Sequence, residues 1–118
     1  SSSVVFVSSI AAVIGVATNS VYGASKAALI SLCRSLAMEL VDKHVRINCV
    51  APGLVETEMV QRAREMMPPE LFEAMVEKHP LGIGQPVDVA NAIAFLLADT
   101  GRWITGQTLI LDGGLSVP

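Results

Sequence analysis

The sequence predicts an α/β fold built around a parallel sheet. Stretches rich in β-forming residues occur at Val4–Val7, Val45–Val50 and Gln107–Leu111, and helical segments separate them. The first run is continuously apolar, which is the pattern of a strand buried on both faces. Alternation of such strands with helices favours a parallel sheet that carries helices on its faces.

The segment from roughly Val21 to Val41 predicts a long helix that buries one face. Apolar side chains recur at the spacing of an amphipathic helix: Leu29, Leu32, Cys33, Leu36, Ala37 and Leu40. A second face carries only small residues: Ala24, Ala27, Ala28, Ser31 and Ser35. Because small side chains let another helix approach closely, this face predicts either a subunit contact or packing within the chain. His44 follows the helix and is expected to be an exposed residue in the left-handed conformation.

The strand at 45–50 is expected to end at Pro52 and Gly53, since proline removes a backbone donor and glycine permits an unusual turn. In the segment 54–80, charged residues alternate with methionines, and Pro68-Pro69 divides it into two short amphipathic helices. Methionine adapts to irregular shapes, which would suit a substrate loop, and it is equally typical of an ordinary core. His79, just before a proline, is expected at the surface.

A loop at Gly82–Gly84 is expected to lead into the last helix, which begins at Gln85–Asp88. Its apolar stripe has the same helical spacing as the first one: Val89, Ala90, Ile93, Ala94 and Leu97. The final strand at 107–111 then ends at an Asp-Gly-Gly turn.

Tyr22 and Lys26 are the candidate catalytic pair, at i and i+4 on one face of the predicted helix. A phenol is a poor base near neutral pH, and a neighbouring ammonium favours its ionised form by Coulomb attraction. Ser9 follows the first strand, at the sheet edge where open α/β folds bind ligands. Its hydroxyl would then reach the same substrate oxygen. A tyrosine packed over a lysine stem would show the same spacing without any chemistry.

Four stretches together resemble the short-chain dehydrogenase/reductase family. They are Ser9, Tyr22-x-x-x-Lys26, the run Arg-Ile-Asn-Cys-Val-Ala-Pro-Gly-Leu-Val-Glu-Thr at 46–57, and Ile-Thr-Gly-Gln-Thr-Leu-Ile-Leu-Asp-Gly-Gly at 104–114. Their order and spacing match the family, and the resemblance covers essentially all 118 residues. The members that resemble it most include those like the 3-oxoacyl-carrier-protein reductases. The resemblance implies the C-terminal half of a doubly wound, parallel-sheet Rossmann-like fold.

The same resemblance implies an NAD(P)-dependent oxidoreductase that interconverts a secondary alcohol and a ketone. Tyr22 would be the general acid/base, and Lys26 would promote its ionisation and hold the nicotinamide ribose. Ser9 would orient and polarise the substrate oxygen. The segment 54–80 corresponds to the substrate loop of the family, and a homodimer or homotetramer is expected.

The resemblance also implies contacts to NAD or NADP, without a choice between the two. Besides Tyr22 and Lys26, the implied cofactor-binding residues are Pro52, Gly53, Val55 and Thr57. The Val55 backbone would bond the carboxamide of the nicotinamide. The Thr57 hydroxyl would reach the carboxamide or a phosphate.

The Gly-x-x-x-Gly-x-Gly turn with which the family cradles the cofactor pyrophosphate has no match here. We therefore expect residues 1–118 to be a partial domain without the N-terminal cofactor-cradle half. The composition agrees, because 52% of residues are hydrophobic and only 16% are charged, below the usual share of about 25%. The alternative to an enzyme is an inactive fragment or a helix-mediated assembly module that cannot bind the dinucleotide by itself.

Composition argues against several other classes of protein. The net charge of −3 offers no basic footprint, so no nucleic-acid partner is expected. No apolar run reaches the roughly 18 residues that span a bilayer, so no membrane partner is expected. No metal-ligand spacing occurs. Cys33 and Cys49 lie within apolar helix and strand patterns, which predicts free buried thiols in a cytoplasmic protein.

Overall fold

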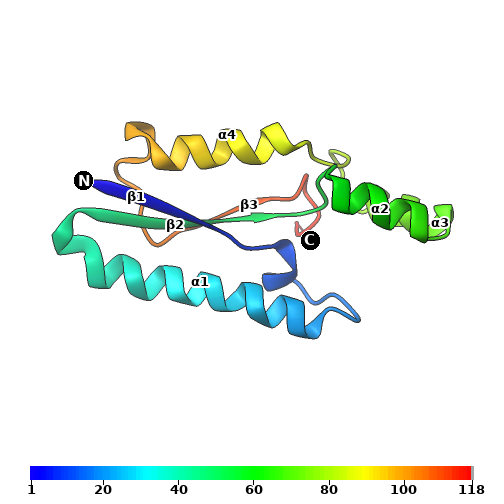
Figure 1. Cartoon of the computed structure of the whole chain (residues 1–118), viewed down its shortest axis with the longest axis horizontal. Helices are drawn as coiled ribbons and strands as arrows, with labels where there is room; N and C mark the ends of the chain where they lie inside the picture. The colour runs from blue at the N-terminus through cyan, green and yellow to red at the C-terminus, as the bar shows by residue number, and fades with distance from the viewer. Residues whose placement is uncertain (118) are drawn as a thin grey trace.

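The computed structural model describes residues 1–117 and confirms the predicted α/β fold (Figure 1). The helices and strands are β1 (Ser2–Val7), α1 (Ser20–Leu40), β2 (Val45–Pro52), α2 (Glu58–Met66), α3 (Pro69–Glu77), α4 (Pro86–Leu97) and β3 (Thr108–Leu111). Short 3-10 turns lie at η1 (Ile10–Ala12), η2 (Val41–Lys43) and η3 (Asp99–Gly101). None of the helices within 1–117 combines the length and the apolar character that a bilayer crossing needs.

The sheet has the order β1-β2-β3 with all pairs parallel. Val7 at the end of β1 pairs with Val50, and Leu111 at the end of β3 pairs with Pro52. The carboxyl ends of the strands therefore meet at one edge of the sheet, where ligands bind in folds of this type. Helix α1 lies on one face and α4 on the other, while α2 and α3 project beyond the carboxyl edge (Figure 1).

The core lies where α1 packs on β2. Cys33 and Ala37 of the helix meet Ile47 and Cys49 of the strand, and all are at most 2% exposed. Cys33 and Ala37 of the predicted stripe therefore face the sheet, and Leu36 and Leu40 pack against the same cluster, whereas Leu32 is 46% exposed. Both cysteines are free and buried, as expected. Burial, with a further contribution from the neighbouring Cys33, raises the pKa of the Cys49 thiol to about 12.

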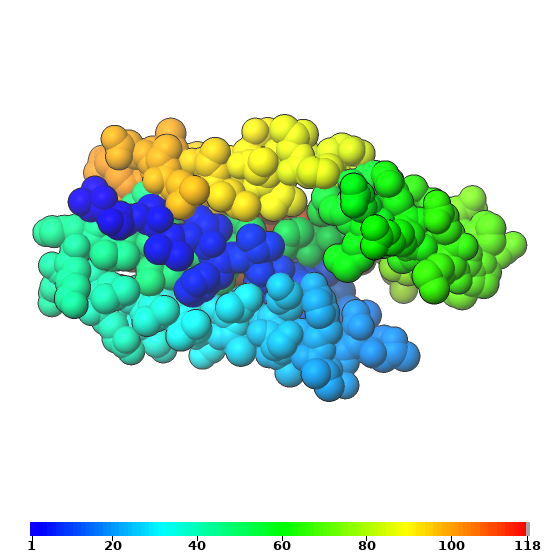
Figure 2. All heavy atoms as spheres, viewed as in Figure 1, coloured from blue at the N-terminus to red at the C-terminus, as the bar shows by residue number. Residues whose placement is uncertain are grey.

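Strand β1 exists as predicted but is not buried on both faces. Among residues 1–117 it pairs only with β2, and Val4 and Val7 remain 39% and 47% exposed. In the space-filling view its residues, coloured dark blue, lie uncovered between α4 and α1 (Figure 2). The apolar run that predicts a doubly buried strand thus has one free edge in this chain, and a side chain on each of its faces is partly open to solvent.

The ends of the helices follow their local sequences. His44 is exposed and adopts φ 56°, ψ 37°, the left-handed conformation predicted for it. Pro69 occupies the first turn of α3, where its missing N–H costs no hydrogen bond. Gln85 and Asp88 form a capping box at the start of α4, with Asp88 Oδ2 accepting from Gln85 N at 2.7 Å.

Two polar side chains of β2, the partly buried Arg46 and the buried Asn48, fasten α4 and β3 to the sheet. The Arg46 guanidinium donates to carbonyl oxygens at the end of α4 and beyond it: Leu96, Leu97, Ala98 and Ile104. Asn48 is fully buried; it donates to Ile104 O at 3.0 Å and accepts from Gln107 N at 3.0 Å. These bonds set where the chain enters β3.

Asp112 ends β3 and organises the turn that follows. It is 9% exposed, and its carboxylate accepts from Gly114 N at 3.0 Å and Ser116 N at 2.8 Å. Burial raises the pKa of the Asp112 carboxyl, but the hydrogen bonds from Ser116 and Gly114 outweigh burial and hold the pKa below its usual value. The carboxylate is therefore the form that the folded protein prefers.

Asn48→Ala should destabilise the protein by about 1 to 3 kcal/mol, because it leaves Gln107 N without its partner and Ile104 O bonded only to Arg46. Urea unfolding of the full-length protein measures this loss. The control is Gln107→Ala, which removes an exposed side chain and should change the free energy of unfolding by less than about 0.5 kcal/mol. Equal effects of the two substitutions would contradict the role of Asn48 in fastening β3 to the sheet.

Asp112→Asn should lower the free energy of unfolding at neutral pH and have little effect in acid. The folded-state pKa lies below the ordinary value of 3.8, so the stabilisation is complete above that value and is lost as the pH falls through the folded pKa. Urea unfolding at pH 7 and at successively lower pH measures the difference. The exposed Asp42, changed to Asn, is the control. If the two proteins differ by the same free energy of unfolding at the lowest pH measured as at pH 7, the lowered folded-state pKa of Asp112 is contradicted.

Candidate active site

Two reciprocal hydrogen bonds fix the start of α1 to the tip of β1. Ser8 Oγ donates to the backbone oxygen of Lys26 at 2.8 Å, and Lys26 Nζ donates to the backbone oxygen of Val7 at 3.2 Å. Ser8 is 4% exposed, so the first of these bonds is shielded from water. Lys26 is thereby held at both its backbone and its side chain against the end of the strand.

Tyr22 lies one helical turn before Lys26, as the spacing predicts. The Lys26 ammonium is 5.7 Å from the centroid of the Tyr22 ring, within the range in which a cation is attracted to an aromatic ring. Tyr22 is 46% exposed, so a ligand can reach it. An ammonium has three donors, and within residues 1–117 Lys26 uses one of them, in the bond to Val7 O.

Ser9 lines the same cavity as this pair. Its side chain caps η1 by accepting a hydrogen bond from Ala11 N at 3.2 Å, which leaves the hydroxyl hydrogen free to be donated. The turn packs tightly on α1, since a Cβ on Gly23 would lie only 2.8 Å from Ala11 O. The glycine after Tyr22 therefore permits the close approach that brings Ser9 near the tyrosine.

Two cavities meet at these residues. A cavity of about 360 Å³ lies between η1 and the end of α3, and one of about 510 Å³ lies between α1 and the start of α2. Both are lined by Ser9, Tyr22, Gly53 and Leu54. The second cavity brings together every site residue predicted from the sequence: Ser9, Tyr22, Lys26, Pro52, Gly53, Val55 and Thr57.

The turn after β2 presents polar groups to the second cavity. Leu54 O accepts from Gly84 N at 2.9 Å, and Val55 O accepts from Thr57 N at 2.8 Å. The Val55 N–H has no hydrogen-bond partner within residues 1–117. Thr57 Oγ1 caps α2 by accepting from Val60 N at 3.2 Å, and its hydroxyl hydrogen stays available.

His79 is a residue of this site that the sequence analysis placed wrongly. It is 7% exposed rather than at the surface, and it lines the smaller cavity. Its ring bonds Leu54 N at 3.1 Å and Met75 O at 2.9 Å. Nothing in the sequence around His79 signals these contacts, because Leu54 is 25 residues away along the chain.

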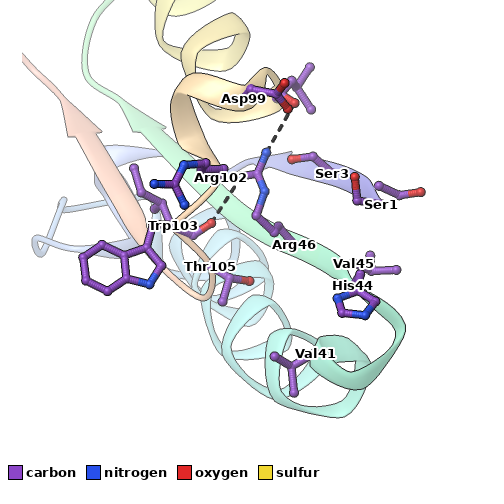
Figure 3. Close-up of a pocket in the computed structure, with 13 residues that line it drawn as sticks. Ser1, Ser3, Val41, His44, Val45, Arg46, Asp99, Arg102, Trp103 and Thr105 are labelled. Atoms are coloured by element: carbon purple, nitrogen blue, oxygen red, sulfur yellow. Dashed lines mark hydrogen bonds between the residues drawn. The ribbon is translucent and has the colours of Figure 1, made fainter.

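A further hollow of about 610 Å³ lies at the opposite end of the sheet, around the start of β1 and β2 (Figure 3). Its central guanidinium, Arg46, is already bonded to backbone carbonyls of the α4 end. Trp103 is 92% exposed. No group of three or more His, Cys, Asp or Glu within 1–117 could hold a metal ion, here or elsewhere. The polar groups predicted to form a site converge instead at the carboxyl edge of the sheet.

Comparison with curated proteins finds relatives over nearly the whole chain. A tropinone reductase homolog of Arabidopsis thaliana is 41% identical over 98% of this chain and 43% of its own length. The 3-oxoacyl-[acyl-carrier-protein] reductase FabG of Rickettsia felis is 41% identical over 95% of this chain and 45% of its own length. The chain therefore spans less than half the length of these relatives.

Solved structures agree with the sequence comparison. An oxidoreductase of the short chain dehydrogenase/reductase family from Burkholderia thailandensis superposes with a TM-score of 0.90 at 38% identity, covering 98% of this chain and 45% of that one. ElxO with NADP bound superposes with a TM-score of 0.86 at 36% identity, covering 96% of this chain and 46% of that one. The family model described as enoyl-(acyl carrier protein) reductase matches residues 1–116. The chain thus belongs to the short-chain dehydrogenase/reductase family of oxidoreductases.

Proposed function

We propose that this chain carries the catalytic residues of an NAD(P)-dependent oxidoreductase that interconverts a secondary alcohol and a ketone. One observation carries the proposal: Ser9, Tyr22 and Lys26 line the same cavity as the turn at 52–57. These residues come from β1, α1 and β2, so only the folded sheet assembles them. Their convergence favours an enzyme over the alternative of a helix-mediated assembly module.

Tyr22 is the general acid/base of the proposed reaction. In the reducing direction its hydroxyl gives a proton to the substrate oxygen while the carbonyl carbon gains a hydride, and the reverse transfers occur in oxidation. Ser9 donates its free hydroxyl hydrogen to the same oxygen and so stabilises the charge that develops there. The Lys26 ammonium, 5.7 Å from the tyrosine ring, favours the phenolate that remains after the proton leaves.

The groups around the larger cavity fit a nicotinamide with its ribose. The Val55 N–H suits the carboxamide oxygen, the Thr57 hydroxyl suits the carboxamide or a phosphate, and the remaining Lys26 hydrogens suit ribose hydroxyls. Pro52 and Gly53 form the wall beside them. The nicotinamide, when bound, supplies or accepts the hydride. The similarity to ElxO with NADP bound supports this class of cofactor without choosing between NAD and NADP.

The smaller cavity is the proposed place of the substrate. It shares Ser9 and Tyr22 with the cofactor cavity, and Met75 of α3 lines it. The segment 54–80, which contains α2 and α3, is the proposed substrate loop. Because the chain spans less than half the length of its relatives, the cradle for the cofactor pyrophosphate is proposed to lie outside residues 1–118.

A homodimer or homotetramer is the proposed assembly. The small-residue face of α1 is the proposed contact, since most of it is exposed and so does not pack within the chain: Ala24, Ala28, Ser31 and Ser35. The proposed compartment is the cytoplasm, where the free thiols Cys33 and Cys49 would stay reduced. Small-molecule alcohols or ketones are the proposed substrates.

Tyr22→Phe in the full-length protein should lower kcat by about 10²- to 10⁴-fold, because it removes the proton donor and keeps the ring. Steady-state turnover with NADH or NADPH and a panel of ketones measures this, and fluorescence titration should show nearly unchanged cofactor binding. The matched control is Trp103→Phe, which changes an exposed aromatic residue at the other end of the sheet. Unchanged turnover in the Tyr22 variant would contradict the proposal.

A further inference from the structure

We infer that His79 is a positioning residue, which holds the turn shared by the two cavities through a neutral imidazole whose proton is on Nδ1. The inference rests on the proposed function, because the turn matters only where a cofactor and a substrate bind. His79 joins the end of α3, on the substrate side, to Leu54, which lines both cavities. It acts through the backbone of that turn rather than on the reacting atoms.

The two bonds of the ring determine its tautomer. Nδ1 is 2.9 Å from Met75 O, and because a carbonyl oxygen only accepts hydrogen bonds, Nδ1 carries the proton. Nε2 is 3.1 Å from Leu54 N, which only donates, so Nε2 is the acceptor. An imidazolium has no acceptor nitrogen and could not make the second bond. The site therefore holds His79 neutral with one defined tautomer.

The same geometry excludes His79 as a group that transfers a proton to or from the substrate. The lone pair of Nε2 points at a backbone N–H, and the Nδ1 proton is bound to a helix carbonyl. A general base needs a free lone pair within reach of the substrate proton. Although His79 lines the substrate cavity, Tyr22 remains the only group proposed to move a proton there.

The hydrogen bond from Leu54 N to His79 orients the Val55 N–H, which is the donor proposed to bind the cofactor. His79 Nε2 fixes the Leu54 N–H, and Gly84 N fixes the Leu54 carbonyl at 2.9 Å. The Leu54 carbonyl and the Val55 N–H belong to one planar peptide unit. Fixing the peptide planes on both sides of Leu54 therefore sets the direction of the free Val55 N–H.

Gly53 shows how closely the ring packs on this turn. A Cβ on Gly53 would lie 3.0 Å from His79 Nε2 and 3.1 Å from the Cα of Asp112. The turn is thus enclosed between the imidazole and the end of β3. Beyond the ring, His79 O accepts from Gly82 N at 2.8 Å, which ties the same residue to the loop before α4.

The first experiment compares His79→Gln with His79→Leu in the full-length protein. A Gln oxygen can accept from Leu54 N, whereas Leu offers no acceptor. Fluorescence titration with NADH or NADPH should show about tenfold weaker binding for His79→Leu, equal to about 1.4 kcal/mol, and a change within about threefold for His79→Gln. The exposed Glu77 at the end of α3, changed to Gln, is the control and should bind as the unaltered protein does. Equal dinucleotide affinity in the Leu and Gln variants, whether high or low, would overturn the inference.

The second experiment reads the protonation of the ring directly in the unaltered protein and uses a variant only to assign the signal. In full-length protein labelled with ¹⁵N-histidine, the signal absent from His79→Gln identifies His79. Its Nδ1 should resonate as a protonated nitrogen and its Nε2 as an unprotonated one, before and after the dinucleotide is added. A protonated Nε2 would overturn the positioning role while leaving the Tyr22→Phe result intact. Retained turnover in Tyr22→Phe would overturn the proposed function while leaving the tautomer unchanged.

Discussion

The parallel pairing of β1 with β2 is the constraint on which the rest of the structure depends. It places the ends of both strands at one edge, so that Ser9 after β1 faces the turn after β2. The reciprocal bonds between Ser8 and Lys26 and between Lys26 and Val7 then fasten α1 to that edge. A helix fastened there cannot slide or rotate without breaking two hydrogen bonds, one of them partly buried. Tyr22, which lies one helical turn before Lys26, is positioned by the same bonds.

The opposite wall of the site is held by groups that come from later parts of the chain. His79 from the end of α3, Gly84 from the loop before α4 and Leu111 from β3 each bond the backbone of the 53–54 turn. The Asp112 carboxylate accepts hydrogen bonds from backbone N–H groups of its own turn. On the other side, the Lys26 ammonium lies 5.7 Å from the centroid of the Tyr22 ring. Rigid backbone on one side and a fastened helix on the other give the preorganisation that the proposed proton transfer needs.

The sequence was sufficient to predict the helices and strands and the residues that line the cavity together. It was not sufficient to predict the side chains that hold those residues in place. Helix α1 and the proline-led α3 follow from local spacing, which acts over a few residues. Tyr22 and Lys26 are neighbours for the same local reason. His79 and Asn48 were not predicted as supports, because their partners lie 25 and more than 50 residues away and only the tertiary fold brings them together. The burial predicted for both faces of β1 was wrong, since an apolar run shows what a strand can pack against and not what this chain supplies.

The most direct test of the account is a crystal structure of the full-length protein with NAD or NADP bound. The nicotinamide should lie in the cavity between α1 and the start of α2, with its carboxamide oxygen within about 3.2 Å of Val55 N. Its ribose hydroxyls should lie at hydrogen-bond distance from Lys26 Nζ, with the Tyr22 hydroxyl facing the ring carbon that exchanges the hydride. A nicotinamide bound elsewhere, for example in the hollow around Arg46, or a Tyr22 hydroxyl directed away from it, would contradict the account.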